Sequence, residues 1–179
     1  MDDVTKTRKH FFPVKTIWFT GIIAFLSLLP ACFKKENYSP IPNIYDASVN
    51  LLEGDSARLT FGFTDGDGDI GLADSEIDAP YDTSSRYHYN LYIEYFEKDD
   101  ALGWVPGINL GGDTIVFKYR LHPVVVKGKN KGIKGTMDVI MQAFYNPLST
   151  QSDTIKYRIQ LIDHALNESN LIETDEIVH

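Results

Sequence analysis

The chain alternates between apolar and polar residues with a period of two along most of its length. The clearest stretch is ARLTFGFT at residues 57–64, in which Ala57, Leu59, Phe61 and Phe63 occupy alternate positions. Successive side chains of a strand point to opposite faces, so this period predicts strands with one apolar face. The pattern predicts about seven such strands, at residues 47–52, 57–64, 88–97, 114–122, 136–145, 154–162 and 172–178.

No stretch after residue 32 shows the apolar period of an amphipathic helix. Parallel strands need long crossover connections, usually helical, whereas antiparallel strands need only short turns. We therefore expect an all-β fold at residues 46–179, an antiparallel immunoglobulin-like (Greek-key) β-sandwich of about seven strands. The single cysteine excludes the cysteine pair of antibody domains, so only the broader architecture is expected.

The first 31 residues have the features of a lipoprotein signal peptide. Basic residues precede an uncharged apolar run at residues 16–29, which is shorter than a membrane span of about 20 residues. A run of this length suits the hydrophobic region of a signal peptide. It leads into Leu29-Pro30-Ala31-Cys32, which resembles the lipobox of bacterial lipoproteins. We expect residues 1–31 to be removed and residues 32–45 to form an extended tether.

Cys32 is the predicted lipidation site. In lipoproteins the cysteine thiol receives a diacylglycerol, the peptide bond before it is cut, and the new amine is acylated with a chain such as palmitate. Each buried methylene contributes about 0.8 kcal/mol, and several chains together anchor a protein stably. The alternatives are a signal anchor with an incidental cysteine, or ordinary cleavage nearby. Phe33 is not the aspartate that retains some lipoproteins at the inner membrane, which favours an outer-membrane lipoprotein on the periplasmic or surface face.

The charge and the missing motifs exclude several classes of function. A formal net charge of −8 argues against nucleic-acid binding, which needs a positive face to neutralise phosphates. Without residues 1–31, which hold four basic and two acidic side chains, the net charge becomes −10. This charge disfavours adhesion to anionic lipid, so the membrane is reached through the lipid anchor. The sequence has no GxSxG, HExxH, glycine-rich phosphate loop or Cys/His pair. We expect a non-catalytic binding or structural module of the cell envelope, with an envelope protein or a glycan as partner.

The most informative motif is DGDGDIGL at residues 65–72. Its aspartates alternate with glycines, which permit the positive φ angles of a tight loop. Clustered carboxylates repel one another without a counter-ion, and their oxygens are ligands that calcium prefers. The spacing resembles an EF-hand loop, with Glu76 at the twelfth position, but Ile70 replaces the required glycine and strands flank the motif. We expect a calcium loop of another type; the alternative is a solvated acidic turn.

A further aspartate is expected to face this loop from the opposite sheet. The inward parity of residues 57–63 continues to Asp65, and the parity of residues 155–161 continues to Asp163. In an immunoglobulin-like key these strands run the same way in opposite sheets, so both aspartates should meet at one end of the core. The predicted calcium ligands are Asp65, Asp67, Asp69, Asp163, a backbone carbonyl near Gly71, Asn167 (which could instead hold its loop) and Glu76, chosen for its spacing.

Two motifs together resemble a known family. DGDGDIGL at residues 65–72 and Asp-x-Ala-Leu-Asn-x-Ser-Asn at residues 163–170 are similar to motifs of small uncharacterised lipoproteins of Bacteroidetes-type bacteria. The resemblance covers nearly the whole chain, including the lipobox. It implies an exported β-sandwich lipoprotein and no established activity. His164 stands where the family pattern has arginine, which removes a cation partner for the aspartates.

Two other functions stay open from the sequence. A carbohydrate-binding lipoprotein of a glycan-uptake system would line aromatic side chains, such as Tyr92, Phe96 and Trp104, along one exposed face. An unrecognised hydrolase would need a deep pocket with converging polar residues.

Overall fold

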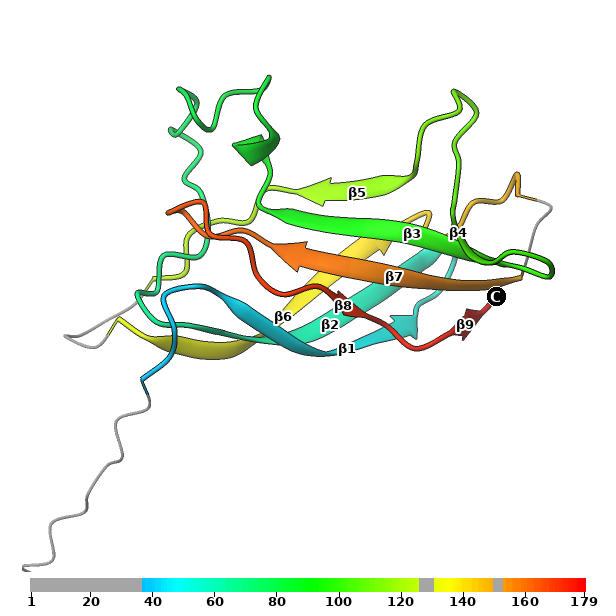
Figure 1. Ribbon diagram of the computed structural model, residues 1–179, viewed down its shortest axis with the longest axis horizontal. Coiled ribbons are helices and arrows are strands. Elements are labelled where there is room, and N and C mark those ends of the chain that lie inside the picture. Colours follow the sequence, from blue (N-terminus) through cyan, green and yellow to red (C-terminus); the bar gives the residue numbers. More distant parts are fainter. Residues whose placement is uncertain (1–36, 126–130, 150–152) are drawn as a thin grey trace, which may run out of the picture. The chain divides into compact units, whose positions relative to one another are not determined.

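The computed structural model describes residues 37–125, 131–149 and 153–179, all within one compact unit, Glu36–His179. The described part consists of two antiparallel sheets that pack together, and its one helical element is a short 3-10 turn, η1 (Arg86–His88) (Figure 1). The all-β sandwich is therefore confirmed, whereas the immunoglobulin-like Greek key stays a prediction. None of the helical structure in these ranges is long and apolar enough to cross a membrane.

The first sheet has three strands, in the order β1 (Asn43–Leu51), β2 (Ser56–Asp65) and β6 (Ile133–Gln142). The central strand, β2, pairs with β6 along its whole length, from Ser56 opposite Gln142 to Asp65 opposite Ile133. Asp65 is thus the last residue of the central strand.

The second sheet has six strands. Four of them follow the order β4 (Gly103–Pro106), β3 (Leu91–Asp99), β7 (Thr154–Leu161) and β8 (Ile172–Glu173). The other two, β5 (Val116–Tyr119) and β9 (Ile177–Val178), pair with β3 and β7. In the antiparallel β3–β7 pair, Leu91 lies opposite Leu161 and Glu97 lies opposite Ile155, so the end of β7 is beside the start of β3.

The core between the sheets is built from the apolar faces that the alternation predicts. Along β2 and β7, every second side chain is at most 6% exposed. Complete burial of a large apolar side chain contributes about 1.5–3 kcal/mol, so these two central strands supply much of the stability. Their core residues are Ala57, Leu59, Phe61, Phe63, Ile155, Tyr157, Ile159 and Leu161.

The first strand begins earlier than the alternation predicts. β1 starts at Asn43 instead of residue 47, so Asn43, Ile44 and Tyr45 belong to the sheet and not to the tether predicted at residues 32–45. A bulge lies between Tyr45 and Ser48, where Asp46 has a φ of 54°. Before the bulge the even-numbered Ile44 faces the core, and after it the odd-numbered Ala47 and Val49 do. The two halves of β1 therefore do not share one alternation. The predicted signal peptide and Cys32 lie outside the described residues.

Other strands end at different residues than predicted, because side chains replace backbone groups as hydrogen-bond partners there. Asn90 accepts a hydrogen bond from the Leu121 backbone at 2.6 Å, where the sequence predicts a strand that continues to residue 122. The Thr174 hydroxyl accepts from the Tyr157 N–H at 3.1 Å, which divides the strand predicted at residues 172–178 into β8 and β9. The alternation does not predict the short strand β4, since four residues are too few to show a period.

Candidate metal centre

The candidate site lies where β2 and β7 end, at one end of the sandwich (Figure 1). Asp65 is the last inward residue of β2 and is 0% exposed, and Asp163 follows β7 and is 1% exposed. The two strands lie in opposite sheets and bring these carboxylates to the same place. Both residues lie at inward positions, where the alternation along β2 and β7 otherwise places apolar side chains. Each carboxylate therefore lies directly above the core.

The loop after β2 contacts the segment before β1 at its start and the core at its end. A Cβ atom on Gly66 would lie 2.4 Å from the carbonyl oxygen of Tyr38, so only glycine lets the loop pass this close to the segment before β1. Further on, Ile70 and Leu72 are each 1% exposed. The Leu72 N–H donates to the Leu121 carbonyl at 2.8 Å. The loop that carries the aspartates is thus anchored in the core.

The buried Ile70 explains why the loop departs from the EF-hand pattern. An EF-hand requires glycine at this position for a sharp turn. Here the residue is a core anchor, and the turn falls at Gly71, which has a φ of 111°. A Cβ atom on Gly71 would lie 2.3 Å from the His122 carbonyl oxygen. The loop is therefore built differently although its aspartates have EF-hand spacing.

The loop after β7 is shaped around Asp163. The carboxylate accepts hydrogen bonds from the Asn167 backbone N–H at 2.7 Å and from the Asn167 side-chain amide at 2.9 Å. Leu166 adopts a φ of 69° inside this turn. Asn167 therefore orients Asp163, which is one of the two roles expected from the sequence.

Backbone hydrogen bonds join the two loops through Asp69. The His164 N–H donates to the Asp69 carbonyl at 3.0 Å, and the Ala165 N–H donates to Asp69 Oδ2 at 3.0 Å. The Asp69 N–H in turn donates to Asp65 Oδ2 at 3.0 Å. These contacts use Oδ2 of Asp65 and Oδ2 of Asp69, and they leave Oδ1 of both residues for a different partner.

Four aspartates from the two loops converge. One carboxylate oxygen from each lies within 4.8 Å of the other three, a spacing at which these residues could hold a metal ion. Three of the cluster's oxygens are buried and have no hydrogen-bond partner among the described residues: Asp65 Oδ1, Asp67 Oδ1 and Asp69 Oδ1. The aspartate cluster consists of Asp65, Asp67, Asp69 and Asp163.

Burial and mutual repulsion raise the pKa values within the cluster. Burial raises the pKa of Asp65 from 3.8 to about 6, and the charges of Asp67 and Asp69 add to the effect. Burial also raises the pKa of Asp69 to about 6, together with the charges of Asp163 and Asp67. The pKa of Asp163 is raised, again mainly by burial. The ionised carboxylates of the cluster therefore destabilise one another, and either bound protons or a bound cation would relieve this.

No ion pair connects the cluster to a basic side chain within the described ranges. Two basic side chains of the neighbouring loops are engaged elsewhere. Arg120 donates to three backbone carbonyls, those of His88, Ala73 and Glu76. His164 points its Nε2 at Glu76 Oε1, 2.5 Å away. The negative charge of the cluster is thus not neutralised by these neighbouring side chains.

The structure brings together some of the predicted ligands and not others. The four aspartates meet, whereas Glu76 lies outside the cluster. Its carboxylate accepts from the Ala73 N–H at 2.6 Å and contacts His164, and that hydrogen bond with His164 is the main cause that lowers the Glu76 pKa. Gly71 shapes the turn, and its carbonyl as a ligand stays a prediction.

Sequence reasoning missed a tyrosine that supports the site. The Tyr81 hydroxyl donates to the His164 carbonyl at 2.5 Å, and the two rings lie 5.1 Å apart. This contact joins the long loop after β2 to the turn that holds Asp163. No local pattern marks Tyr81, because its partner lies 83 residues away in the chain.

The three aromatic residues that would favour sugar binding are covered by basic side chains. The Arg158 guanidinium lies 4.6 Å from the centre of the Phe96 ring, and Phe96 is 8% exposed. Lys156 lies 4.6 Å from the Trp104 ring, and Lys118 lies 6.0 Å from the Tyr92 ring. These are cation–π distances, so the rings already have partners on this face.

Comparison of the chain with protein-family models, curated proteins and solved structures finds no match.

Proposed function

We propose that the aspartate cluster binds calcium, and that the protein is a lipid-anchored, calcium-stabilised binding or structural module of the cell envelope. The observation that carries the calcium proposal is the set of three buried, unpartnered carboxylate oxygens among four convergent aspartates. A buried carboxylate that lacks a partner is costly, and a shared cation removes that cost at several residues at once.

The donor atoms favour calcium over other common metals. The cluster offers only carboxylate oxygens, which are hard donors that suit calcium, magnesium and manganese more than zinc or copper. Oxygens that share a calcium ion at about 2.3–2.6 Å can lie up to about 5 Å apart. Magnesium requires a near-ideal octahedron with shorter bonds and dehydrates reluctantly. A loosely shaped group of oxygens within 4.8 Å of one another therefore suits calcium better.

A calcium ion at this place would join the two sheets. Asp65, Asp67 and Asp69 belong to the end of β2 and its loop, and Asp163 follows β7 in the other sheet. Its two positive charges would offset part of the repulsion among the four carboxylates, and the shared ion would hold the two loops together at this end of the sandwich. The expected role of the metal is therefore structural, since it holds a binding module in shape.

The envelope location rests on the sequence. The lipobox-like Leu29-Pro30-Ala31-Cys32 directs the chain to export and lipidation. Calcium sites of extracellular modules bind with dissociation constants of about 10⁻⁴–10⁻³ M, which suits a stabilising ion outside the cytoplasm. A glycan-binding role is disfavoured on the face of β3 and β4, where basic side chains cover the aromatic rings.

The test is a thermal melt of the purified protein, stripped of metal and then given calcium or magnesium. At 100 times the dissociation constant calcium should add about 2.7 kcal/mol to the free energy of unfolding. The melting temperature should then rise by several degrees, and magnesium should raise it less.

Three variants test whether the calcium-induced rise in melting temperature comes from the aspartate cluster. Asp67→Asn and Asp163→Asn should each remove most of the calcium-induced rise. Asp74→Asn is the matched control, because this exposed residue lies nearby in the loop but outside the cluster. Equal melting temperatures with and without calcium in the metal-stripped wild type would refute the proposal.

A further inference from the structure

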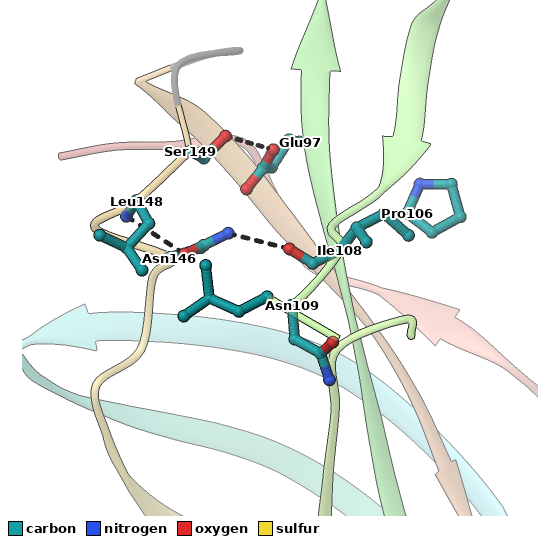
Figure 2. Close-up of a pocket in the computed structure, with 8 residues that line it drawn as sticks. Glu97, Pro106, Ile108, Asn109, Asn146, Leu148 and Ser149 are labelled. Atoms are coloured by element: carbon teal, nitrogen blue, oxygen red, sulfur yellow. Dashed lines mark hydrogen bonds between the residues drawn. The ribbon is translucent and has the colours of Figure 1, made fainter. Parts of the chain in front are cut away.

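A second polar pocket lies at the opposite end of the sandwich from the aspartate cluster. Glu97 lies opposite Ile155 near the start of β7, whereas Asp163 follows the end of the same strand. The pocket has a volume of about 250 Å³ and lies between the segment after β4 and the segment after β6. Its lining includes Leu110 and the residues that Figure 2 labels, among them Glu97, Ile108, Asn146, Leu148 and Ser149.

Glu97 places a buried carboxylate in this pocket. The residue is only 3% exposed, because it continues the inward face of β3 after Tyr95. Its Oε2 accepts a hydrogen bond from the Ser149 hydroxyl at 2.6 Å (Figure 2). Its Oε1 is buried and has no hydrogen-bond partner in the part of the chain that the structure describes. None of the residues that line the pocket is basic.

Among the described residues that line the pocket, none supplies a cation to Glu97. The Tyr95 hydroxyl accepts from the Asn146 N–H at 3.2 Å. Burial raises the Tyr95 pKa, with smaller contributions from the charge of Glu97 and from a side-chain hydrogen bond between the Tyr95 hydroxyl and the Glu97 carboxylate. A Cβ atom on Gly107 would lie 3.4 Å from Glu97 Oε1. The carboxylate is thus enclosed by two hydroxyl groups, those of Tyr95 and Ser149, and by the backbone at Gly107, and none of these groups carries a positive charge.

Two asparagines hold the rim of the pocket in place. The Asn146 side chain donates to the Ile108 carbonyl at 3.2 Å, which joins the two segments across the pocket (Figure 2). Asn109 Oδ1 accepts from the backbone of Gly111 and Asp113 at 2.8 and 3.0 Å. The rim is therefore fixed before any ligand arrives, which lowers the entropic cost of binding.

The mouth of the pocket is apolar. Three of its lining side chains are large and exposed: Ile108 at 46%, Leu148 at 64% and Leu110 at 89%. A neighbouring pocket of about 490 Å³ shares Asn109, Leu110 and Asn146 and extends the apolar surface. An aliphatic chain can lie on this rim while a charged end reaches the buried carboxylate.

From this arrangement we propose that the pocket binds an aliphatic primary ammonium, the side chain of a lysine on a partner protein, with the ammonium on Glu97 Oε1 and the methylenes on the leucine rim. A metal ion fits poorly, because one carboxylate oxygen is far from the six to eight ligands of calcium. A guanidinium binds best to both oxygens of a carboxylate, and here Ser149 occupies one. An ammonium is a compact charge that needs only the free oxygen.

The experiment titrates the full-length protein with Nα-acetyl-lysine N-methylamide and follows backbone amide signals by NMR. The signals of Asn146 and Ser149 should shift with saturation. The norleucine analogue, which lacks the ammonium, should bind at least about tenfold more weakly, since a charge-assisted hydrogen bond is lost. n-Butylammonium should bind in the same place, but more weakly than the lysine amide if the occupant is a protein.

Variants tie the binding to the pocket. Glu97→Gln keeps the shape of the side chain and should weaken lysine amide binding by roughly tenfold or more. Leu110→Ser alters an exposed rim residue and should weaken it by a few-fold. Glu94→Gln is the control, because Glu94 lies on the outer face of β3 and contacts Arg158 at 3.5 Å. All titrations are repeated with and without calcium, since the site is independent of the aspartate cluster.

Several results would overturn the proposal. The first is equal binding of the lysine amide and the norleucine analogue to the wild type. The second is unchanged affinity in a folded Glu97→Gln variant. Preference for n-butylammonium over the lysine amide would exclude a protein lysine as the occupant. A missing calcium response with intact lysine binding would refute the metal proposal alone.

Discussion

At the scale of single residues, Asn170 shows how one side chain joins the two sheets. Its Oδ1 accepts from the Ile44 N–H at 2.8 Å, and its Nδ2 donates to the Ile44 carbonyl at 2.8 Å. Asn170 lies just before β8, whereas Ile44 belongs to β1 in the other sheet. The side chain therefore satisfies both backbone groups of a residue that is 1% exposed.

Asn170→Ala should lower the free energy of unfolding by about 1–3 kcal/mol, because it leaves a buried N–H and carbonyl without partners. Chemical denaturation of the variant and the wild type measures this difference. Asn50→Ala is the matched control, since Asn50 is an exposed residue on the same strand, β1. A difference of less than about 0.5 kcal/mol from that control would show that water replaces both hydrogen bonds.

The carboxyl groups of Asp65 and Asp69 give the metal-free protein a distinct pH dependence. Their pKa values are about 6 in the folded chain and 3.8 in a free aspartate. The folded state therefore holds more protons between pH 4 and pH 6, and its stability falls as the pH rises through this window. In our proposal calcium binding would displace these protons, so the stabilisation by calcium should increase from pH 5 to pH 7.

Melting temperatures of metal-stripped protein, measured from pH 4 to pH 7 with and without calcium, test this dependence. Asp65→Asn should flatten the fall in stability between pH 4 and pH 6, because it removes one of the two titrating groups. Stability of the metal-free wild type that rises across the same window would contradict the raised pKa values of these carboxyl groups.

At the scale of elements, the strands that the sequence predicts well are those whose pairing is regular. β2 and β7 keep one parity from end to end, and that parity correctly placed Asp65 and Asp163 above the core. The same signal continues along β3 to Glu97, which sequence reasoning did not single out. A buried charged residue that continues the inward face of a strand thus marks both candidate sites.

The remaining features depend on contacts between distant residues, which a local period cannot show. The bulge at Asp46 interrupts the alternation, so the sequence pattern does not show where β1 begins. The Thr174 hydroxyl accepts a hydrogen bond from the Tyr157 N–H and so divides the last predicted strand in two. Glu76 has the spacing of a calcium ligand, but its carboxylate is turned to Ala73 and His164. Sequence spacing thus predicted the aspartate loop, and tertiary hydrogen bonds decided which side chains enter the cluster.

The loop after β2 depends on Ile70 as its anchor. Ile70→Ala removes a side chain that is 1% exposed and should cost about 2–5 kcal/mol of stability. It should also weaken calcium binding, because the aspartates before it lose their fixed position. Calorimetric titration and denaturation measure the two effects, and Ile77→Ala, at a residue that is 65% exposed, is the control. Calcium affinity equal to that of the wild type would show that Ile70 serves stability alone.

At the scale of the whole molecule, the two ends of the sandwich have different chemistry. The segment before β1 passes close to Gly66, so the chain enters the sandwich at the end that carries the aspartate cluster. The Glu97 pocket lies at the other end, remote from this entry point. In our proposals the metal stabilises the end nearest the tether, and the opposite end receives a partner.

The remaining prediction concerns the attachment of the whole molecule to the membrane through Cys32. No other cysteine is present, and a chain with a net charge of −8 has no electrostatic affinity for anionic lipid. Cys32→Ser should therefore abolish labelling by a radioactive fatty acid in growing cells and leave an unprocessed precursor. Asp67→Asn serves as the control, because lipidation acts on the segment before the folded domain and should not need calcium. Persistent labelling of Cys32→Ser would show that the lipid is attached elsewhere, and a mature-sized Cys32→Ser product would indicate cleavage by a different signal peptidase.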